Sequence, residues 1–144
     1  MLARVYLAPQ LGTEREALQG IADMLYARNV AWIRSMLASG LVPPARALLC
    51  APPWCERGVR YVRFHGTRPL DRERDYFDGP VMFHRGEATC LELSAYDAAA
   101  MTVLEGVSAS PLVVGGGPSY HCIIRIPGPP VATLDLTEGV TPWR

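Results

Sequence analysis

The sequence predicts an α+β fold in which helices come first and an antiparallel sheet follows. Residues 13–39 carry apolar side chains at the spacing of one helix face, and residues 90–104 read as a helix that is apolar on nearly every side. After this helix the pattern changes to short β-branched and aliphatic runs separated by Gly and Pro. Helices and strands that are segregated in this way are typical of α+β proteins.

Length and composition indicate one domain, residues 1–144, which is long enough to bury a core without disulfides or a metal. The net charge of zero argues against a nucleic-acid partner. No apolar run approaches the roughly 18 to 20 residues of a membrane span, so a membrane is not an expected partner either. The N-terminal residues show no h-region or cleavage site of a signal peptide, and a cytoplasmic location is therefore expected.

The first predicted helix, residues 13–39, opens with a capping-box pattern formed by Thr13 and Glu16. Gly20 and Asn29 are weak helix formers, and the helix could divide into two at either of them.

The predicted helical N-terminal part covers residues 1–56, because "ARALLCA", residues 45–51, is a second helix candidate between proline pairs. Residues 57–65 suit a strand, or a helix end followed by an extended segment. Residues 66–80 are charged and rich in turn formers, which predicts a long surface loop that could border a binding cleft.

The helix over residues 90–104 is the best supported element. Thr89 and Glu92 form a capping-box pattern with Thr89 as N-cap, and Gly106 suits the position after the last turn. Three strands are then expected in "SPLVVGG", "YHCIIRI" and "VATLDLT". The intervening "GGGPS" lacks a lysine and leads into no helix, so it predicts a strand connection and no phosphate-binding loop.

Cys90 is a candidate nucleophile because it occupies the first turn of this helix. Free backbone N–H groups and the positive end of the helix dipole stabilise an anion there, and the thiolate is the reactive form of cysteine. A backbone N–H of the same turn could also stabilise an oxyanion. The alternative for Cys90 is a small buried residue without chemistry.

His121 and Asp135 are candidates for the base and for the group that orients it. Asp135 lies in an aliphatic run, where a carboxylate is costly unless it is paired, and His121 is a natural partner. His121 and Cys122 point to opposite faces of a strand. A five-residue connection 126–130 would bring His121 opposite Asp135, whereas a four-residue connection 127–130 would bring Cys122 there. The triad hypothesis therefore predicts that the connection between the two strands is odd in length or contains a bulge. The alternative for Asp135 is that it simply begins a turn.

A zinc site is an alternative use of the remaining cysteines, although the spacing is loose and no second Cys-x2-Cys follows. We expect neither a metal nor a cofactor. The zinc alternative would draw on Cys50, Cys55, His65 and His84.

Residues 57–137 resemble the transglutaminase-like cysteine peptidase superfamily. The similar segments are "RGVRYVRF", "DYFDGPVMFHRGEATCLELSAYDAAAMTVLEGVSASPLVV", "YHCIIRI" and "VATLDLT", and residues 138–144 would be a tail. The resemblance implies a papain-like fold with a central helix packed on an antiparallel sheet. It also implies that Cys90 is the nucleophile, His121 the base and Asp135 the orienting acid. The implied reaction forms a thioester from an amide, which water hydrolyses or an amine accepts, with a protein or peptide as substrate.

The chain departs from the pattern of this superfamily at two positions. Many compact members have an acid after the cysteine, where this chain has Leu91. Relatives often carry Gln two residues before the proline, where Asp78 stands here, and an ionised carboxylate cannot donate to an oxyanion. "RGEATCLELS" is also similar, more weakly, to arylamine N-acetyltransferases. The chain has no Lys, which excludes cross-linking of its own lysines.

A second hypothesis is that the transglutaminase-like fold serves as a structural or assembly module with weak or no activity. Compact members occur in bacteria and their phages, so the resemblance makes a virion-associated protein and a larger assembly, such as a phage particle, possible partners. The two hypotheses differ in whether the Cys90 sulfur and His121 lie within hydrogen-bonding reach.

Overall fold

A computed structural model describes residues 2–6, 14–44, 59–65, 73–116 and 119–142, and these residues form an α+β fold, as the sequence predicted. The helices are α1 (Glu14–Ala38), α2 (Gly79–Arg85) and α3 (Cys90–Leu104). The strands are β1 (Leu2–Tyr6), β2 (Arg60–Tyr61), β3 (Glu73–Phe77), β4 (Glu87–Ala88), β5 (Ser110–Gly116), β6 (Ser119–Ile126) and β7 (Ala132–Leu134).

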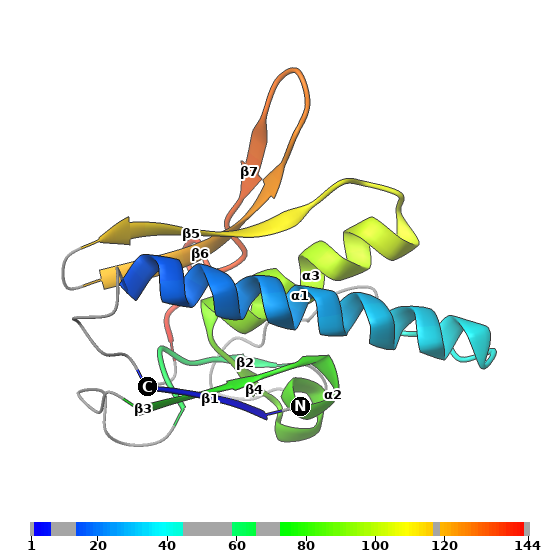
Figure 1. The fold of residues 1–144 in the computed structure, drawn as a ribbon, viewed down its shortest axis with the longest axis horizontal. Coiled ribbons are helices and arrows are strands. Elements are labelled where there is room, and N and C mark those ends of the chain that lie inside the picture. The colour runs from blue at the N-terminus through cyan, green and yellow to red at the C-terminus, as the bar shows by residue number, and fades with distance from the viewer. Residues whose placement is uncertain (1, 7–13, 45–58, 66–72, 117–118, 143–144) are drawn as a thin grey trace.

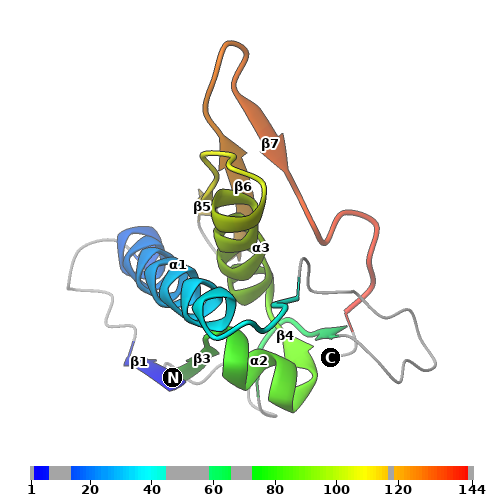
Figure 2. The same ribbon diagram turned by 90° about the vertical axis from the view of Figure 1, so that its right-hand side faces the viewer.

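The two long helices lie between two groups of strands. Helices α1 and α3 pack against each other, and both contact the antiparallel sheet β5–β6–β7 on one side (Figure 1). The pairs β1–β3 and β2–β4, together with α2, lie on the opposite side of the helices (Figures 1 and 2). Helix α3 is therefore covered on several sides, which explains why its sequence is apolar nearly all round.

Helix α1 is one continuous helix of 25 residues, so neither of the possible breaks occurs. Its buried face recurs every three or four residues, which is the period of a helix side packed on a core. That face consists of Leu18, Ala22, Leu25, Asn29 and Ile33. The helix is followed by Gly40 with φ +75°, a left-handed conformation that glycine adopts without strain.

Helix α3 has the predicted bounds and the predicted capping box of Thr89 and Glu92. Every residue from Leu91 to Met101 is buried, and Gly106 follows the helix with φ +70°. The prediction of a buried, capped helix is confirmed.

The region predicted as a surface loop, residues 66–80, is partly a strand and a helix start, so that prediction is wrong for residues 73–80. Strand β3 pairs antiparallel with β1, and Phe77 is buried. Asp78 then caps α2 with an extended backbone. Charged residues in this segment suggested a loop, but its pairing with the N-terminal strand β1 could not be read from the local sequence.

The N-terminal part, residues 1–56, is not purely helical, because β1 precedes α1. The second helix candidate, residues 45–51, lies outside the described residues. Of the predicted segment 57–65, the described residues 59–65 contain the short strand β2, which pairs parallel with β4.

The C-terminal sheet has strands in the three predicted segments, and the connection between the last two is odd in length, but it is not residues 126–130, so His121 does not lie directly opposite Asp135. Ile126 pairs with Ala132, so residues 127–131 form a five-residue connection. Strand β7 ends at Leu134, which places Asp135 one residue past the strand and not within it. Extending the register places Asp135 diagonally across from His121 and on the same face.

Helix α3 runs through the hydrophobic core. Its side chains belong to all three clusters of buried apolar residues. Among the described residues, no helix is long and apolar enough to cross a membrane.

Candidate active site

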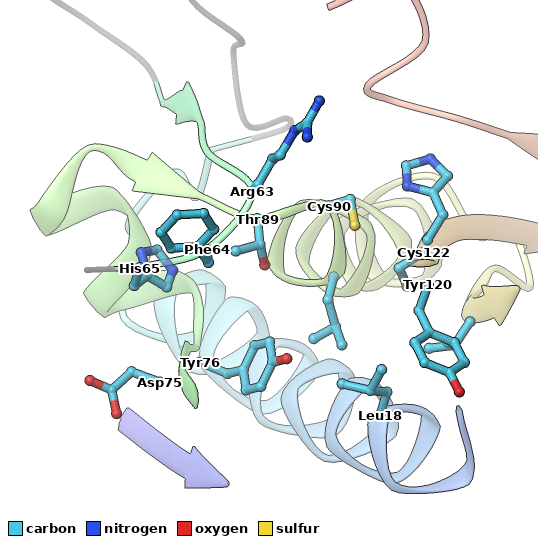
Figure 3. Close-up of a pocket in the computed structure, with 13 residues that line it drawn as sticks. Leu18, Arg63, Phe64, His65, Asp75, Tyr76, Thr89, Cys90, Tyr120 and Cys122 are labelled. Carbon is cyan, nitrogen blue, oxygen red and sulfur yellow. The ribbon is translucent and has the colours of Figure 1, made fainter. Parts of the chain in front are cut away.

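Cys90 is the first residue of α3 and lines a cavity of about 100 Å³. The thiol is a free cysteine and is partly exposed. Figure 3 shows its sulfur directed into the space between α3, α1 and β6. Residues of the segment 63–65 and of β3 complete the wall. The sequence placed Cys90 at a helix start, and the structure adds that this start opens onto a cavity.

A buried carboxylate fixes the turn that carries Cys90. Glu92 is 1% exposed, and its Oε1 accepts hydrogen bonds from the backbone N–H of Thr89 at 2.7 Å and from the Thr89 hydroxyl at 3.0 Å. The same oxygen lies 2.6 Å from Nε2 of His65, and Oε2 accepts from the backbone N–H of Phe77. Glu92 therefore ties the start of α3 to β3 and to the segment that holds His65.

His65 lies between two carboxylates and is almost fully buried. Its Nδ1 is 3.1 Å from Glu87, and its Nε2 bonds Glu92. Burial alone would lower the pKa of His65, but the hydrogen bonds and charges of Glu92 and Glu87 outweigh it and raise the pKa. Because both ring nitrogens face carboxylate oxygens, the arrangement favours the imidazolium, which donates from both. The ring also packs on Phe77, with centroids 4.0 Å apart.

His121 and Asp135 form the predicted pair. Nε2 of His121 lies 2.9 Å from Oδ2 of Asp135, and both side chains are about one-third exposed. Burial would raise the pKa of Asp135, but the bonds with His121 and Thr137 outweigh it and hold the pKa below its usual value. Because Nε2 is engaged by the carboxylate, Nδ1 is the nitrogen left for another partner.

Thr137 fixes the orientation of the Asp135 carboxylate. Its backbone N–H and its hydroxyl both donate to Oδ1 of Asp135 at 3.0 Å, which leaves Oδ2 for His121. The hydroxyl oxygen also lies 3.4 Å from Nε2 of His121. Tyr61 approaches the same group: burial, followed by the charge of Cys90, raises the pKa of its hydroxyl, while a hydrogen bond with Thr137 opposes the shift.

The Cys90 side chain is the main influence on His121. Hydrogen bonding with Cys90 raises the pKa of His121 to about 9 against the lowering effect of burial, and Asp135 adds to the rise. A histidine with this pKa holds a proton at neutral pH when it faces a thiolate. The geometry thus joins a thiol, an imidazole and a carboxylate in the order that general-base activation of a nucleophile requires.

Cys122 has a different environment, as the strand geometry predicted. It is 2% exposed, and its backbone carbonyl accepts a hydrogen bond from Ser94 at 3.0 Å. Burial raises the pKa of the Cys122 thiol to about 12. Its side chain therefore stays a neutral thiol in the core, and it serves as a matched control for Cys90.

Two other sequence candidates that the structure describes, Asp78 and His84, do not join this group. Asp78 is buried at the start of α2, 3.4 Å from Nε of Arg28, and it is not among the residues that line the cavity. Leu91 does line it. His84 is exposed on α2. Cys50 and Cys55 lie outside the described residues, and no cluster of three or more possible metal ligands occurs among those described.

Sequence reasoning missed the groups that surround the triad candidates. Thr137 had a local signal, because an Asp followed two positions later by Thr is a common turn pattern in which the carboxylate accepts from the backbone. The sequence gives no local signal for the position of His65, because its contacts with Glu87 and Glu92 depend on how distant segments pack. The loop expected to border the cleft, residues 66–80, supplies Asp75 and Tyr76 to the cavity wall.

Comparisons with protein-family models, with curated proteins and with solved structures find no match to this chain. The chemistry of the site is therefore inferred from its own geometry.

Proposed function

We propose that this protein is a cysteine-dependent acyl-transfer enzyme that hydrolyses an amide bond of a peptide through a thioester. Cys90 is the nucleophile, His121 the general base and acid, and Asp135 the orienting carboxylate. The observation that carries the proposal is the position of His121, whose Nε2 lies 2.9 Å from Asp135 and which lines the same cavity as Cys90.

In the first half-reaction, the proton of Cys90 rests on His121, and the Cys90 sulfur attacks the amide carbonyl carbon as a thiolate. The carbonyl oxygen becomes an oxyanion. The backbone N–H of Cys90 lies in the first helical turn, where intrahelical acceptors are lacking, and it is the natural donor to this charge. The C–N bond then breaks, and His121 gives its proton to the leaving amine.

In the second half-reaction, water attacks the thioester carbonyl while His121 removes a proton from the water. Collapse of the intermediate breaks the C–S bond, releases a carboxylic acid and returns the proton to the Cys90 sulfur. Asp135 stabilises the imidazolium in both halves without itself becoming protonated, which agrees with its lowered pKa.

The arrangement of elements supports a papain-like core as part of the proposal. In that fold the nucleophile begins a central helix, and the base and its partner come from the sheet packed on it. Here Cys90 begins α3, and His121 lies on β6, which packs against α3. The remaining elements, including α1 and the β1–β3 pair, would be additions to such a core.

The test uses a library of N-blocked peptides incubated with the purified protein, with products and acid-quenched protein measured by mass spectrometry. We expect cleavage and a transient acyl adduct on the peptide that contains Cys90. The Cys90→Ala variant should lose both, whereas Cys122→Ala should keep both if circular dichroism shows that it folds. Equal cleavage by Cys90→Ala, or no cleavage of any library peptide by the folded wild type, would contradict the proposal.

A further inference from the structure

The cavity beside Cys90 is built largely from the protein's own apolar core. Its walls include Leu18 of α1, Leu91 of α3 and Val113 of β5, with exposed fractions of 7%, 5% and 5%. Tyr76 of β3 and Tyr120 of β6 stand at its sides. These residues belong to one cluster of buried apolar side chains or pack against it, so the floor of the cavity is a gap in the surface of the core.

Two charged residues that line the cavity, Arg63 and Asp75, do not face its interior. Figure 3 shows the side chains of Arg63 and Asp75 directed away from the space between Leu18, Tyr76 and Tyr120. The imidazole of His65 contacts carboxylate oxygens through both of its nitrogens. The side chains of Leu18, Leu91 and Val113 offer no hydrogen-bond partner, so a charged or amide group that lay among them would lose water without compensation from them.

The size of the cavity limits its occupant to one small side chain. An apolar cavity of about 150 Å³ in another protein is large enough to bind benzene. The volume of about 100 Å³ here suits an aliphatic side chain and is tight for an aromatic ring. Pockets for whole drug-sized ligands are several times larger, roughly 300 to 1,000 Å³.

The proposed nucleophile, Cys90, forms part of the cavity wall. This position indicates which part of a bound substrate would enter the cavity. Cys90 itself lines the cavity, and Figure 3 shows its sulfur on the same side of α3 as Tyr120 and Cys122. A side chain attached next to the attacked carbonyl is separated from the sulfur by only a few bonds in the thioester. That side chain is therefore the group that reaches the cavity.

We infer that the cavity formed by Leu18, Leu91 and Val113 is a specificity pocket for an aliphatic side chain, such as that of Leu, on the residue whose carbonyl Cys90 attacks. This inference rests on the proposed function and names its substrate class: peptides cleaved after an aliphatic residue, in preference to glycine, glutamine or charged residues. Because Leu18 lies on α1, this helix would also contribute to substrate selection. Helix α1 precedes the segment that resembles the superfamily.

The test compares acetyl-dipeptidyl chloromethyl ketones that differ only in the side chain next to the reactive carbonyl. The rate constant for labelling Cys90 is measured by intact mass, and iodoacetamide, which needs no pocket, reports the reactivity of the thiol separately. We expect the Leu reagent to react at least about 10 to 100 times faster than the Gly reagent, because a single methylene buried in a fitted apolar pocket is already worth about tenfold or more. Phe, Gln, Glu and Arg reagents should react more slowly than Leu.

Two variants test the location of the pocket. Val113→Phe fills it, so the preference for Leu over Gly should fall to less than about threefold while the iodoacetamide rate is retained. Leu18→Ala enlarges it and should shift the preference toward Phe. Val114→Phe is the matched control, because Val114 is the next residue of β5 and does not line this cavity.

The outcomes separate the two claims. Rapid iodoacetamide labelling of Cys90 without any side-chain preference among the ketones would overturn the pocket and leave the proposed function standing. The pocket is overturned in the same way if the wild type prefers Gly, Gln or a charged reagent, or if Val113→Phe and Val114→Phe behave alike. Slow labelling of Cys90 by iodoacetamide would instead overturn the proposed function, and the pocket with it.

Discussion

At the scale of single residues, the proposed chemistry depends on His121, which bonds Asp135 and lines the same cavity as Cys90. Asp135 occupies Nε2, and Thr137 holds the carboxylate through its other oxygen. The pairing of His121 with Asp135 could be inferred from sequence because a carboxylate in an aliphatic run needs a partner. The role of Thr137 became visible only when the chain after β7 was seen to turn back on Asp135.

The raised pKa of His121 sets an alkaline limit to activity. His121 must give a proton to the leaving amine, and with a pKa of about 9 it loses that proton as the pH rises through 9. In Asp135→Asn the hydrogen bond and charge that help to raise the pKa of His121 are weakened. The decline of the cleavage rate at alkaline pH should therefore begin at a lower pH in this variant. The maximum cleavage rate should also fall by about 10²- to 10⁴-fold.

This prediction is measured as the rate of peptide cleavage from pH 5 to pH 10. Glu138→Gln, at an exposed position three residues away, is the control and should keep the wild-type profile. An Asp135→Asn profile that coincides with that of the wild type would show that Asp135 does not act through His121.

At the scale of elements, the beginning of α3 is the part of the fold that positions the nucleophile. Its bounds were predictable because N-caps, buried faces and a following glycine are local signals. Strand β3 was missed because its partner β1 lies some seventy positions earlier, and its sequence "ERDYF" shows only a weak strand pattern. The same long-range packing brings His65 to Glu92, which no spacing in the sequence indicates.

Glu92 should contribute more to stability than an ordinary helix carboxylate. It is fully buried and accepts from Thr89, His65 and Phe77, so Glu92→Gln replaces an acceptor by a donor inside a charged network. We expect the free energy of unfolding in urea to fall by about 3 kcal/mol, because breaking a buried ion pair leaves an uncompensated charge.

Glu105→Gln provides the control, since Glu105 is exposed at the other end of α3. Its effect should stay within about 0.5 kcal/mol, as for most surface substitutions. If the two variants lose the same stability, Glu92 is not the anchor of the helix start.

At the scale of the whole molecule, α1 is part of the core that supports the site. It packs along α3 and β5, and its Leu18 reaches the cavity beside Cys90. The sequence predicted this helix and the C-terminal sheet from their periodicities. It did not predict that strands would cover the other side of the helices, because short pairs such as β2–β4 have too few residues to show a period.

The packing of α1 can be tested by removing one buried side chain. Leu25 is fully buried in the cluster beneath the cavity, so Leu25→Ala should lower the free energy of unfolding by about 2 to 5 kcal/mol. Leu37 is 45% exposed on the same helix, and Leu37→Ala should cost less than about 1 kcal/mol. Similar losses for both variants, measured by chemical denaturation, would mean that α1 does not pack as described.

The central claim is that Cys90 is an activated thiol paired with His121. The direct measurement is the rate of alkylation of each cysteine by iodoacetamide at pH 6, followed by peptide mass spectrometry, in the wild type and in His121→Ala. We predict that Cys90 reacts at least about tenfold faster than Cys122 and the other two cysteines, because Cys90 lines a cavity with His121, whereas Cys122 is buried in the core. We also predict that His121→Ala removes this advantage. A wild-type protein in which Cys90 reacts no faster than the others would contradict the claim.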